Sequence, residues 1–314
     1  MPPKILFISG PTASGKTRLA VELALRHGGE VVSADSMQVY RRMDIGTAKP
    51  TPEEMRGIPH HMLDVADPEE DFSVARYVEL AAPCVDDILA RGKLPIVAGG
   101  TGLYLDSLLS GRTFAPFSPD GGLRARLEAR FDALGGEAML GELAAADPEA
   151  AARLHPNDRK RIVRALEVFQ QTGKTISQHN RETRALPLRY DALTLSLAFQ
   201  CREDMWARID RRVDEMMAAG LAEEVRALLD SGVPVRCTAM QAIGYKEMAA
   251  ALRGGGDVCA AAEEIKLRSR QYAKRQLTWF RRTEGAKWLF WGPEPDFEAA
   301  CRTSTKYLEE FGLV

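Results

Sequence analysis

The sequence Gly10-Pro11-Thr12-Ala13-Ser14-Gly15-Lys16-Thr17 matches the pattern G-x-x-x-x-G-K-[ST] at every fixed position. The apolar run Ile5–Ile8 before it is typical of a short buried strand, and Thr17–Arg26 after it has helical character. A strand, a glycine-rich turn and a helix in this order form the context in which the pattern binds phosphate. The sequence therefore predicts a phosphate-binding loop close to Met1.

Each residue type in this loop has a chemical role. The glycines let the backbone fold so that its N–H groups point at anionic oxygens, and the N-terminus of the following helix adds partial positive charge. Lys16 contributes a full positive charge, and the Thr17 hydroxyl is placed to ligate a Mg²⁺ shared with the phosphates. We expect a diphosphate or triphosphate to be held by Gly10, Pro11, Thr12, Ala13, Ser14, Gly15, Lys16 and Thr17, with Thr17 as the metal ligand.

Strand patterns recur along the chain with helical stretches between them. Glu30–Ala34 and Leu94–Ala98 are short apolar runs, and Leu193–Phe199 alternates as a strand does. Alternating strands and helices favour an α/β fold, here a P-loop NTPase-like parallel sheet flanked by helices. Three further helical stretches are expected at Met205–Asp230, Met240–Leu252 and Asp257–Arg282.

The composition changes in the middle of the chain. From Leu123 to about Gln171 the residues are rich in Ala, Leu, Glu and Arg, which favour helix. A length of 314 residues fits about two domains. We therefore expect a discontinuous P-loop core, 1–114 and 188–314, and a mainly helical insertion domain over residues 115–187.

Two strand ends carry candidate polar groups. The second strand runs into Asp35, which would lie near the phosphates because ligands bind beyond the carboxyl ends of parallel strands. Asp35 fits a general base and equally fits a residue that caps the next turn. The third strand ends at Thr101 without an acidic residue, which disfavours a standard motor ATPase and leaves a small-molecule kinase open.

Basic residues are concentrated in two helical segments although the net charge is −2. Lys266–Arg282 carries seven cations and no anion, and its apolar residues fall in one arc of a helix. Arg159-Lys160-Arg161 forms a second cluster within the predicted insertion. Each cluster alone fits a solvated helix face, but together they favour a nucleic-acid partner.

Other classes of protein are disfavoured. The five cysteines are scattered, which argues against a disulfide framework and a cysteine zinc site. Neither a signal peptide nor a long apolar segment is apparent, so we expect a cytoplasmic protein with no membrane partner. His60-His61 has poor spacing for a shared metal and is expected to make structural polar contacts.

Taken in order, several motifs resemble the tRNA dimethylallyltransferase family, also called tRNA isopentenyltransferases. They are GPTASGKT (Gly10–Thr17), SADSMQVYRRMDIGTAKP (Ser33–Pro50), PHHMLD (Pro59–Asp64), GGTGLY (Gly99–Tyr104), RKRIVRALEV (Arg159–Val168), AMQAIGYKE (Ala239–Glu247) and YAKRQLTWFR (Tyr272–Arg281). The loop at Gly10–Thr17 alone would be weak, but the set spans nearly the whole chain and is specific. One departure is the run Asp120–Arg126, where the family has a more acidic helix start.

The resemblance implies transfer of a dimethylallyl group from dimethylallyl diphosphate to N6 of the adenosine 3′-adjacent to the anticodon, in tRNAs reading codons that start with U. Lys16 and a Mg²⁺ on Thr17 would hold the diphosphate leaving group, and Arg212 would reach it. Asp35 would act as general base and Thr101 would orient the same centre, so the implied catalytic residues are Asp35, Thr101 and Lys16. The implied tRNA-binding residues are Asp35, Ser36, Met37, Gln38, Thr101, Arg124, Arg159, Lys160, Arg161, Ile162, Val163, Gln241, Lys246, Lys274 and Arg275. We expect a monomer.

Three alternatives remain open from the residues themselves. A kinase of a small metabolite would use Lys16, Thr17 and Asp35 but gives no purpose to Lys266–Arg282. A prenyltransferase of free adenine nucleotides would not need long basic helices either. A non-enzymatic RNA-binding protein would not need an intact phosphate loop together with Asp35.

Overall fold

A computed structural model of the chain describes residues 2–111, 114 and 122–314. The chain divides into two compact units. Unit 1 consists of Met1–Leu109 and Arg189–Val314, and unit 2 consists of Ser110–Leu188. The expected boundary at 114/115 adjoins residues 112–113 and 115–121, which lie outside the described residues, as does part of the run 120–126.

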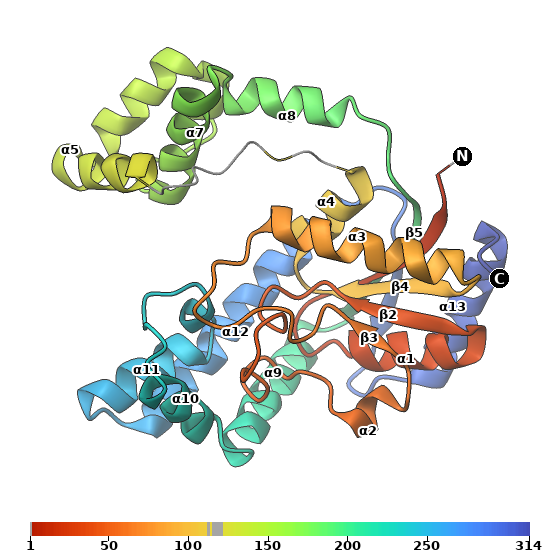
Figure 1. The fold of residues 1–314 in the computed structure, drawn as a ribbon. Helices are drawn as coiled ribbons and strands as arrows, with labels where there is room; N and C mark the ends of the chain where they lie inside the picture. The colour runs from red at the N-terminus through yellow and green to blue at the C-terminus, as the bar shows by residue number, and fades with distance from the viewer. Residues whose placement is uncertain (1, 112–113, 115–121) are drawn as a thin grey trace. The chain divides into compact units, whose positions relative to one another are not determined.

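Unit 1 is built on one parallel sheet of six strands in the order β3-β2-β4-β1-β5-β6 (Figure 1). The strands are β1 (Lys4–Ser9), β2 (Gly29–Ser33), β3 (His60–His61), β4 (Leu94–Gly99), β5 (Asp191–Phe199) and β6 (Lys287–Trp291). In β1, Ile5 and Phe7 belong to one apolar core, whereas Leu6 and Ile8 belong to another. Strand β1 is therefore covered on both faces, as is typical of parallel sheets. All pairings of the six strands are parallel, which confirms the predicted parallel sheet.

Helices cover both faces of this sheet (Figure 1). They are α1 (Lys16–His27), α2 (Pro52–Met55), α3 (Val74–Ala90), α4 (Gly102–Ser110), α9 (Arg202–Ala218), α10 (Leu221–Asp230), α11 (Tyr245–Gly254), α12 (Val258–Phe280) and α13 (Phe297–Phe311), with the 3₁₀ helix η1 (Ala239–Gln241). Helices α1 and α13 pack in the core that contains Leu6, and α3 and α11 pack in the core that contains Ile5. Within the described part of the chain, no helix combines the length and the apolar character needed to cross a membrane.

The order of the strands creates a binding crevice. Strands β4 and β1 are neighbours in the sheet. The chain leaves β1 toward β2, which lies beyond β4, and it leaves β4 toward β5, which lies beyond β1. Adjacent strands whose connections leave in opposite directions open a crevice beyond their carboxyl ends, where ligands of such sheets bind. The phosphate loop follows β1, and Gly100 and Thr101 follow β4.

The structure differs from the predicted helices and strands in several places. The stretch Met205–Asp230 forms two helices because Gly220 adopts a φ of 100° that ends the first and begins the second. The stretch Met240–Leu252 forms η1 and α11, separated by a turn at Gly244. Neither β3 nor β6 was predicted from the sequence. His60 and His61 make the polar contacts expected of them, with the carbonyl oxygen of Ile58 and with Glu30.

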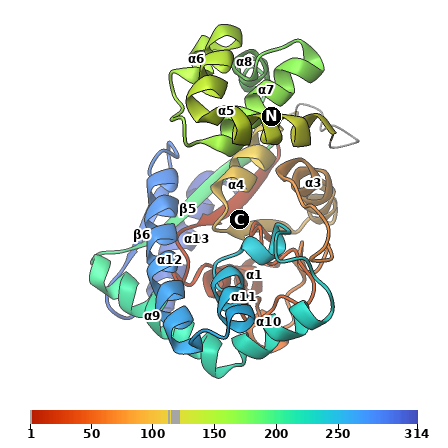
Figure 2. The same cartoon turned by 90° about the vertical axis from the view of Figure 1, so that its left-hand side faces the viewer.

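Unit 2 consists of helices around its own apolar core, as Figure 2 shows for α5, α6, α7 and α8. These helices are α5 (Gly122–Ala146), α6 (Pro148–Ala151), α7 (Arg159–Thr172) and α8 (Ile176–Arg184). Met139, Leu143, Ile162 and Leu166 are completely or almost completely buried in this core. The segment is therefore helical throughout its regular elements.

Candidate active site

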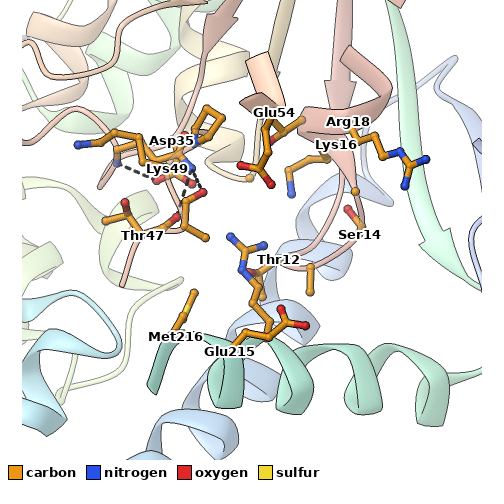
Figure 3. A pocket seen from close by; sticks show the side chains of 18 of the residues that line it. Thr12, Ser14, Lys16, Arg18, Asp35, Thr47, Lys49, Glu54, Glu215 and Met216 are labelled. Carbon is orange, nitrogen blue, oxygen red and sulfur yellow. Dashed lines mark hydrogen bonds between the residues drawn. The ribbon is translucent and has the colours of Figure 1, made fainter. Parts of the chain in front are cut away.

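A pocket of about 620 Å³ opens at the carboxyl edge of the sheet (Figure 3). Its walls come from the phosphate loop, the loop after β2, the end of β4, and helices α9 and α12. Figure 3 shows Lys16, Asp35 and Glu54 facing the same space. Residues from far-apart parts of the chain therefore surround one cavity at the predicted position.

Two glycines give the phosphate loop its shape. Gly10 has a φ of 153°, and a Cβ atom there would lie 2.9 Å from the carbonyl oxygen of Leu197. Gly15 has a φ of 81°, and a Cβ atom there would lie 2.7 Å from the ring of Phe297. The Trp291 indole N–H donates a 2.8 Å hydrogen bond to the carbonyl oxygen of Ser14. The loop is therefore backed by aromatic side chains from β6 and α13, and larger residues at its glycines would displace it.

Two cations of the pocket, Lys16 and Arg212, take part in none of the ion pairs found among the described residues, whereas Lys49 on the same lining pairs with Asp44 and Asp64. Burial, and next the positive charge of Arg212, lower the pKa of Lys16 to about 7, against the charge of Asp35, which raises it. The Lys16 Nζ donates to the carbonyl oxygen of Pro11 at 2.7 Å. Among the described residues, the buried Nε of Arg212 and the buried Oγ of Ser14 have no hydrogen-bond partner. Such donors are costly unless an anion completes them, which is what a diphosphate provides.

Asp35 makes the hydrogen bonds of the turn-capping alternative. Its Oδ1 accepts hydrogen bonds from the N–H groups of Met37 at 2.8 Å and Gln38 at 3.3 Å, as a turn-capping residue does. The hydrogen bonds found for its carboxylate both end on Oδ1. Asp35 also lines the pocket, so its carboxylate reaches the cavity, and its role as general base stays a prediction.

Thr101 belongs to a polar group beside Asp35. Its Oγ1 accepts a 3.1 Å hydrogen bond from the N–H of Ser36, so it fixes the turn that carries Asp35. Burial and the nearby Asp35 charge raise the pKa of Tyr272 to about 12, against hydrogen bonds from Thr101 and Gln276. The Tyr272 phenol is therefore neutral and lines the same pocket.

Gln276 joins two loops of the site from α12. Its Oε1 accepts a 2.9 Å hydrogen bond from the N–H of Thr12, and its Nε2 donates to the carbonyl oxygen of Gly100 at 2.9 Å. A Cβ atom on Gly100 would lie 2.3 Å from this Nε2. One buried side chain thus holds the phosphate loop against the end of β4.

The remaining expected tRNA contacts in unit 1 do not all reach the pocket. Gln38 lines it, whereas Gln241, Lys246, Lys274 and Arg275 are exposed on the surface outside its lining. The Gln241 Nε2 donates to the carbonyl oxygen of Val235 at 2.8 Å. The structure therefore separates a buried group around Asp35 from an exposed group on η1, α11 and α12.

The cations in the first half of α12 are already paired with acidic side chains. Lys266 pairs with Asp214 at 2.6 Å, and Arg270 pairs with Asp210 at 2.9 Å, both acids lying on α9. The sequence of α12 alone hides this compensation because the acids belong to another helix. Lys274 and Arg275 in the second half take part in none of the ion pairs found among the described residues.

Trp279 also departs from the expected apolar arc. Its side chain is 40% exposed, whereas the arc members Ile265, Ala273 and Phe280 are buried and Tyr272 is half-buried. Its indole N–H donates to Asp106 of α4 at 3.1 Å, and it packs directly on Gly102. Trp279 therefore contacts α4 while part of its ring remains open to solvent.

Unit 2 holds the second group of expected tRNA contacts. Lys160 and Arg161 are exposed, with 74% of the Arg161 side chain open to solvent. Arg159 pairs with Asp132, and Arg124 lies 3.3 Å from the fully buried Glu167. Of these four cations, Arg159 and Arg124 lie against acidic residues of unit 2, whereas Lys160 and Arg161 are largely exposed.

Two residues of the same motif are corrected. Ile162 is 0% exposed and Val163 is 1% exposed, both within the apolar core of unit 2. They lie on the inner face of α7 because apolar residues at this spacing pack on the core. Contact of these two side chains with tRNA was therefore a wrong expectation.

Three residues of the pocket lining were not predicted as site residues from the sequence. Arg208 lines the pocket and its Nε donates to the carbonyl oxygen of Ala13 at 3.2 Å. Tyr272 was assigned only to an apolar helix face, and Gln276 was not singled out. Tyr272 and Gln276 lie in the motif Tyr272–Arg281, which was the available signal for them, whereas Arg208 lies in none of the family motifs.

Comparisons with known proteins agree with this geometry. The family described as IPP transferase matches residues 38–283, and the family described as isopentenyl transferase matches residues 3–70. The tRNA dimethylallyltransferase of Acetivibrio thermocellus is 45% identical over 309 residues, covering 98% of both chains. The tRNA dimethylallyltransferase 1 of Trichlorobacter lovleyi is 50% identical over 289 residues, covering 92% of this chain and 94% of the relative.

This chain belongs to the tRNA dimethylallyltransferase family. A crystal structure of the full-length tRNA isopentenylpyrophosphate transferase from Bacillus halodurans is 42% identical, with a TM-score of 0.73 and coverage of 98% of this chain and 96% of that one. A eukaryotic dimethylallyltransferase acting on tRNA gives a TM-score of 0.80 at 30% identity, covering 98% and 78%. The predicted fold class and the activity class, a prenyltransferase that modifies tRNA, are confirmed.

The residues present fit a metal that arrives with a phosphate ligand. Thr17 lines the pocket next to Lys16. Over the described ranges, no group of three or more His, Cys, Asp or Glu side chains is arranged to hold a metal ion. Mg²⁺ is usually bound through few protein ligands together with phosphate oxygens and water, so one hydroxyl suffices. The Thr17 hydroxyl is therefore compatible with a Mg²⁺ that arrives with a diphosphate, and its role as metal ligand stays a prediction.

Proposed function

We propose that the chain transfers the dimethylallyl group of dimethylallyl diphosphate to N6 of the adenosine directly 3′ of the anticodon and releases diphosphate. The proposed acceptors are tRNAs that read codons starting with U. The observation that carries this proposal is that Asp35 lines one pocket together with Lys16 and with Arg212, whose buried Nε has no hydrogen-bond partner among the described residues. A base and an anion site in one cavity suit a reaction that moves a proton while a diphosphate leaves.

The donor site is assigned to residues 10–17 with support from α9. Backbone N–H groups of the loop, the Lys16 ammonium and the Arg212 guanidinium would contact the diphosphate oxygens. Bound diphosphate would raise the pKa of Lys16 from about 7, because an adjacent anion favours its charged form. When bound to Thr17, Mg²⁺ would offset negative charge on the leaving group.

The acceptor chemistry is assigned to Asp35, with Thr101 as its support. The C1–O bond of the donor breaks, its electron pair leaves with the diphosphate, and C1 forms a bond with N6 of adenine. Asp35 accepts one of the two N6 protons, which keeps the charge balanced. Thr101 holds the turn at Ser36 and so fixes the direction of the Asp35 carboxylate.

The RNA is proposed to bind through exposed cations outside the pocket. Lys274 and Arg275 on α12, and Lys160 and Arg161 on α7, are exposed and suit the phosphate backbone. The target adenosine is stacked within its loop and must leave the stack to reach Asp35. The exposed cations would stabilise tRNA in the conformation that presents this base.

The test is incubation of the full chain with Mg²⁺, dimethylallyl diphosphate labelled at C1, and unmodified tRNA, followed by nucleoside analysis. The labelled nucleoside is identified as N6-dimethylallyladenosine by its mass. A matched tRNA with guanosine at the target position is the control and should stay unlabelled. Label transferred to free AMP, or ATP consumed with a small acceptor, would replace the proposal by one of its alternatives.

A further inference from the structure

The loop formed by residues 44–49 is one wall of the active-site pocket. Asp44, Ile45, Thr47, Ala48 and Lys49 all line the cavity. The loop has no regular secondary structure, and Ala48 adopts a left-handed φ of 44°. A loop of this kind keeps one shape only if other parts of the chain hold it.

Glu224, on the first turn of α10, holds this loop. Its Oε2 accepts hydrogen bonds from the N–H groups of Asp44 and Ile45, each at 2.8 Å, and its Oε1 accepts one from Gly46 at 3.0 Å. The phenol of Tyr245 donates to the same Oε1 at 2.6 Å. Three successive backbone N–H groups directed at one anion form a concave binding site, here filled by the protein's own carboxylate.

The fit between the loop and α11 leaves no spare room. A Cβ atom on Gly46 would lie 2.4 Å from the ring of Tyr245, which is itself fully buried. Burial and the Glu224 carboxylate raise the pKa of Tyr245 well above its usual value, so the phenol stays a hydrogen-bond donor. The loop is therefore fixed both by sterics at Gly46 and by charge-assisted hydrogen bonds to Glu224.

Hydrogen bonds connect this loop to the proposed base. The Gln38 side-chain amide donates to the carbonyl oxygens of Thr47 at 3.2 Å and Ala48 at 3.1 Å. Its Oε1 accepts a 3.2 Å hydrogen bond from the Ser33 hydroxyl. The backbone N–H of Gln38 donates to Asp35. A displacement of residues 47–48 would thus move Gln38 and with it one of the two hydrogen bonds that orient the carboxylate.

We propose that Glu224 is a positioning residue for the prenyl-transfer step. Through the loop 44–49 and Gln38, Glu224 holds the Asp35 carboxylate in the direction required to accept the N6 proton. Glu224 does not line the pocket, so it acts without touching a substrate. The inference rests on the proposed role of Asp35 as base. It assigns a function in catalysis to α10 and α11, which lie outside the phosphate loop.

The first test is Glu224→Gln, which keeps the size of the side chain and replaces one accepting oxygen by a donor. We expect kcat to fall about 10-fold or more, because misplacement of a reacting group by a fraction of an ångström has such effects. The KM for dimethylallyl diphosphate should stay near wild type, since Glu224 touches none of residues 10–17. The matched control is Glu223→Gln on the same turn, whose side chain is 70% exposed and, within the described residues, forms an ion pair with Arg226 alone.

A double-mutant cycle separates positioning from general weakening of the fold. In an Asp35→Ala background there is no carboxylate to orient, so Glu224→Gln should lower kcat by no more than about twofold further. Single-turnover rates at saturating substrates measure this. A loss in the Asp35→Ala background as large as in wild type would overturn the proposal, as would a wild-type kcat for Glu224→Gln.

Folding and the role of Asp35 are tested separately. If Glu224→Gln does not fold, as judged by its thermal transition, Tyr245→Phe replaces it in the same cycle. That variant removes one of the four donors to Glu224 and should lower kcat about threefold, with the loss again absent in the Asp35→Ala background. If Asp35→Ala itself retains wild-type kcat, the proposed base is wrong. A large effect of Asp35→Ala with none from either partner would refute the role of Glu224 alone.

Discussion

Each edge of the sheet in unit 1 has a charged side chain removed from solvent, Glu30 at the amino edge and Lys16 at the carboxyl edge, but only Glu30 is neutralised by ion pairs. At the amino-terminal end of β2, the Glu30 carboxylate is 3% exposed and binds Arg91, Lys93 and His61. Hydrogen bonds from Arg91 hold the pKa of Glu30 well below its usual value, although burial acts in the opposite direction. Every lone pair that burial takes from water is thus replaced by a donor.

At the carboxyl edge, Lys16 is also removed from solvent, but no carboxylate in the described part of the chain neutralises its charge. Burial lowers the pKa of Lys16 to about 7, and no carboxylate forms an ion pair with it among the described residues. The Nε of Arg212 and the Oγ of Ser14 are buried without partners in the same described set. The difference teaches that a completed cluster stabilises a fold, whereas an incomplete one binds a ligand that completes it.

Lys16→Met gives the largest effect expected from this comparison. Removing the charge that stabilises the leaving diphosphate should lower kcat/KM for dimethylallyl diphosphate about 10³-fold. The thermal transition should not fall, because the lysine is held in the folded state with its pKa lowered to about 7, which destabilises its charged form. Steady-state kinetics and thermal unfolding near neutral pH measure both. A variant that unfolds at lower temperature would assign Lys16 to the fold.

The double substitution Arg91→Gln with Lys93→Gln should do the reverse. It leaves the buried Glu30 with only His61, and an uncompensated buried carboxylate should lower the free energy of unfolding by about 3 kcal/mol. The kcat should stay near wild type because the amino edge is remote from the pocket residues. Asp87→Asn is the control, since it removes only the exposed second partner of Arg91. Lost turnover in the folded double variant would remove the distinction between the edges.

The same contrast between paired and unpaired charges predicts which half of α12 binds tRNA. Lys274→Gln with Arg275→Gln should weaken tRNA binding about 10-fold and lower the slope of log K against log salt by about 2. Lys266→Gln with Arg268→Gln is the matched control, because Asp214, Glu263 and Glu264 already neutralise these cations. Binding titrations at several salt concentrations distinguish the pairs. Equal losses from both pairs would show that existing ion pairs do not decide RNA contact.

The smallest expected effect is an uptake of protons at the carboxyl edge. Lys16 is mostly neutral at about pH 8 in the free protein, and bound inorganic diphosphate should raise its pKa and draw in up to about one proton. Calorimetry in buffers of different ionisation enthalpy measures the uptake, with Lys16→Met as the control. Release of protons, or uptake that persists in Lys16→Met, would contradict the assigned ligand of this lysine.

The sequence predicted the parts of the site that follow strands directly. The phosphate loop, Asp35 and Thr101 each come within a few residues of a strand end, and a parallel sheet brings such ends to one edge. The central strands were also predicted because their apolar runs are continuous. Strand β6 was missed, and its Phe290 is 57% exposed, so its apolar run does not reflect burial alone.

The supports of the site were not predictable because they act across large separations in sequence. Gln276 contacts Thr12, and Glu224 contacts the loop at Ile45, and neither relation has a local pattern. The pairing of α12 cations with acids on α9 was hidden for the same reason. Whether a charged side chain forms an ion pair depends on how distant segments of the chain pack together. The charged side chains that stay without an ion pair are the ones available to a ligand.

The central claim is that Asp35 at the carboxyl edge accepts the proton from the acceptor adenine. Its most direct test is the single-turnover rate of Asp35→Ala with saturating tRNA and dimethylallyl diphosphate, measured beside the Kd for tRNA. The account predicts a rate about 10²-fold or more below wild type and a Kd that is little changed. Equal losses in rate and affinity, or a rate close to wild type, would contradict it.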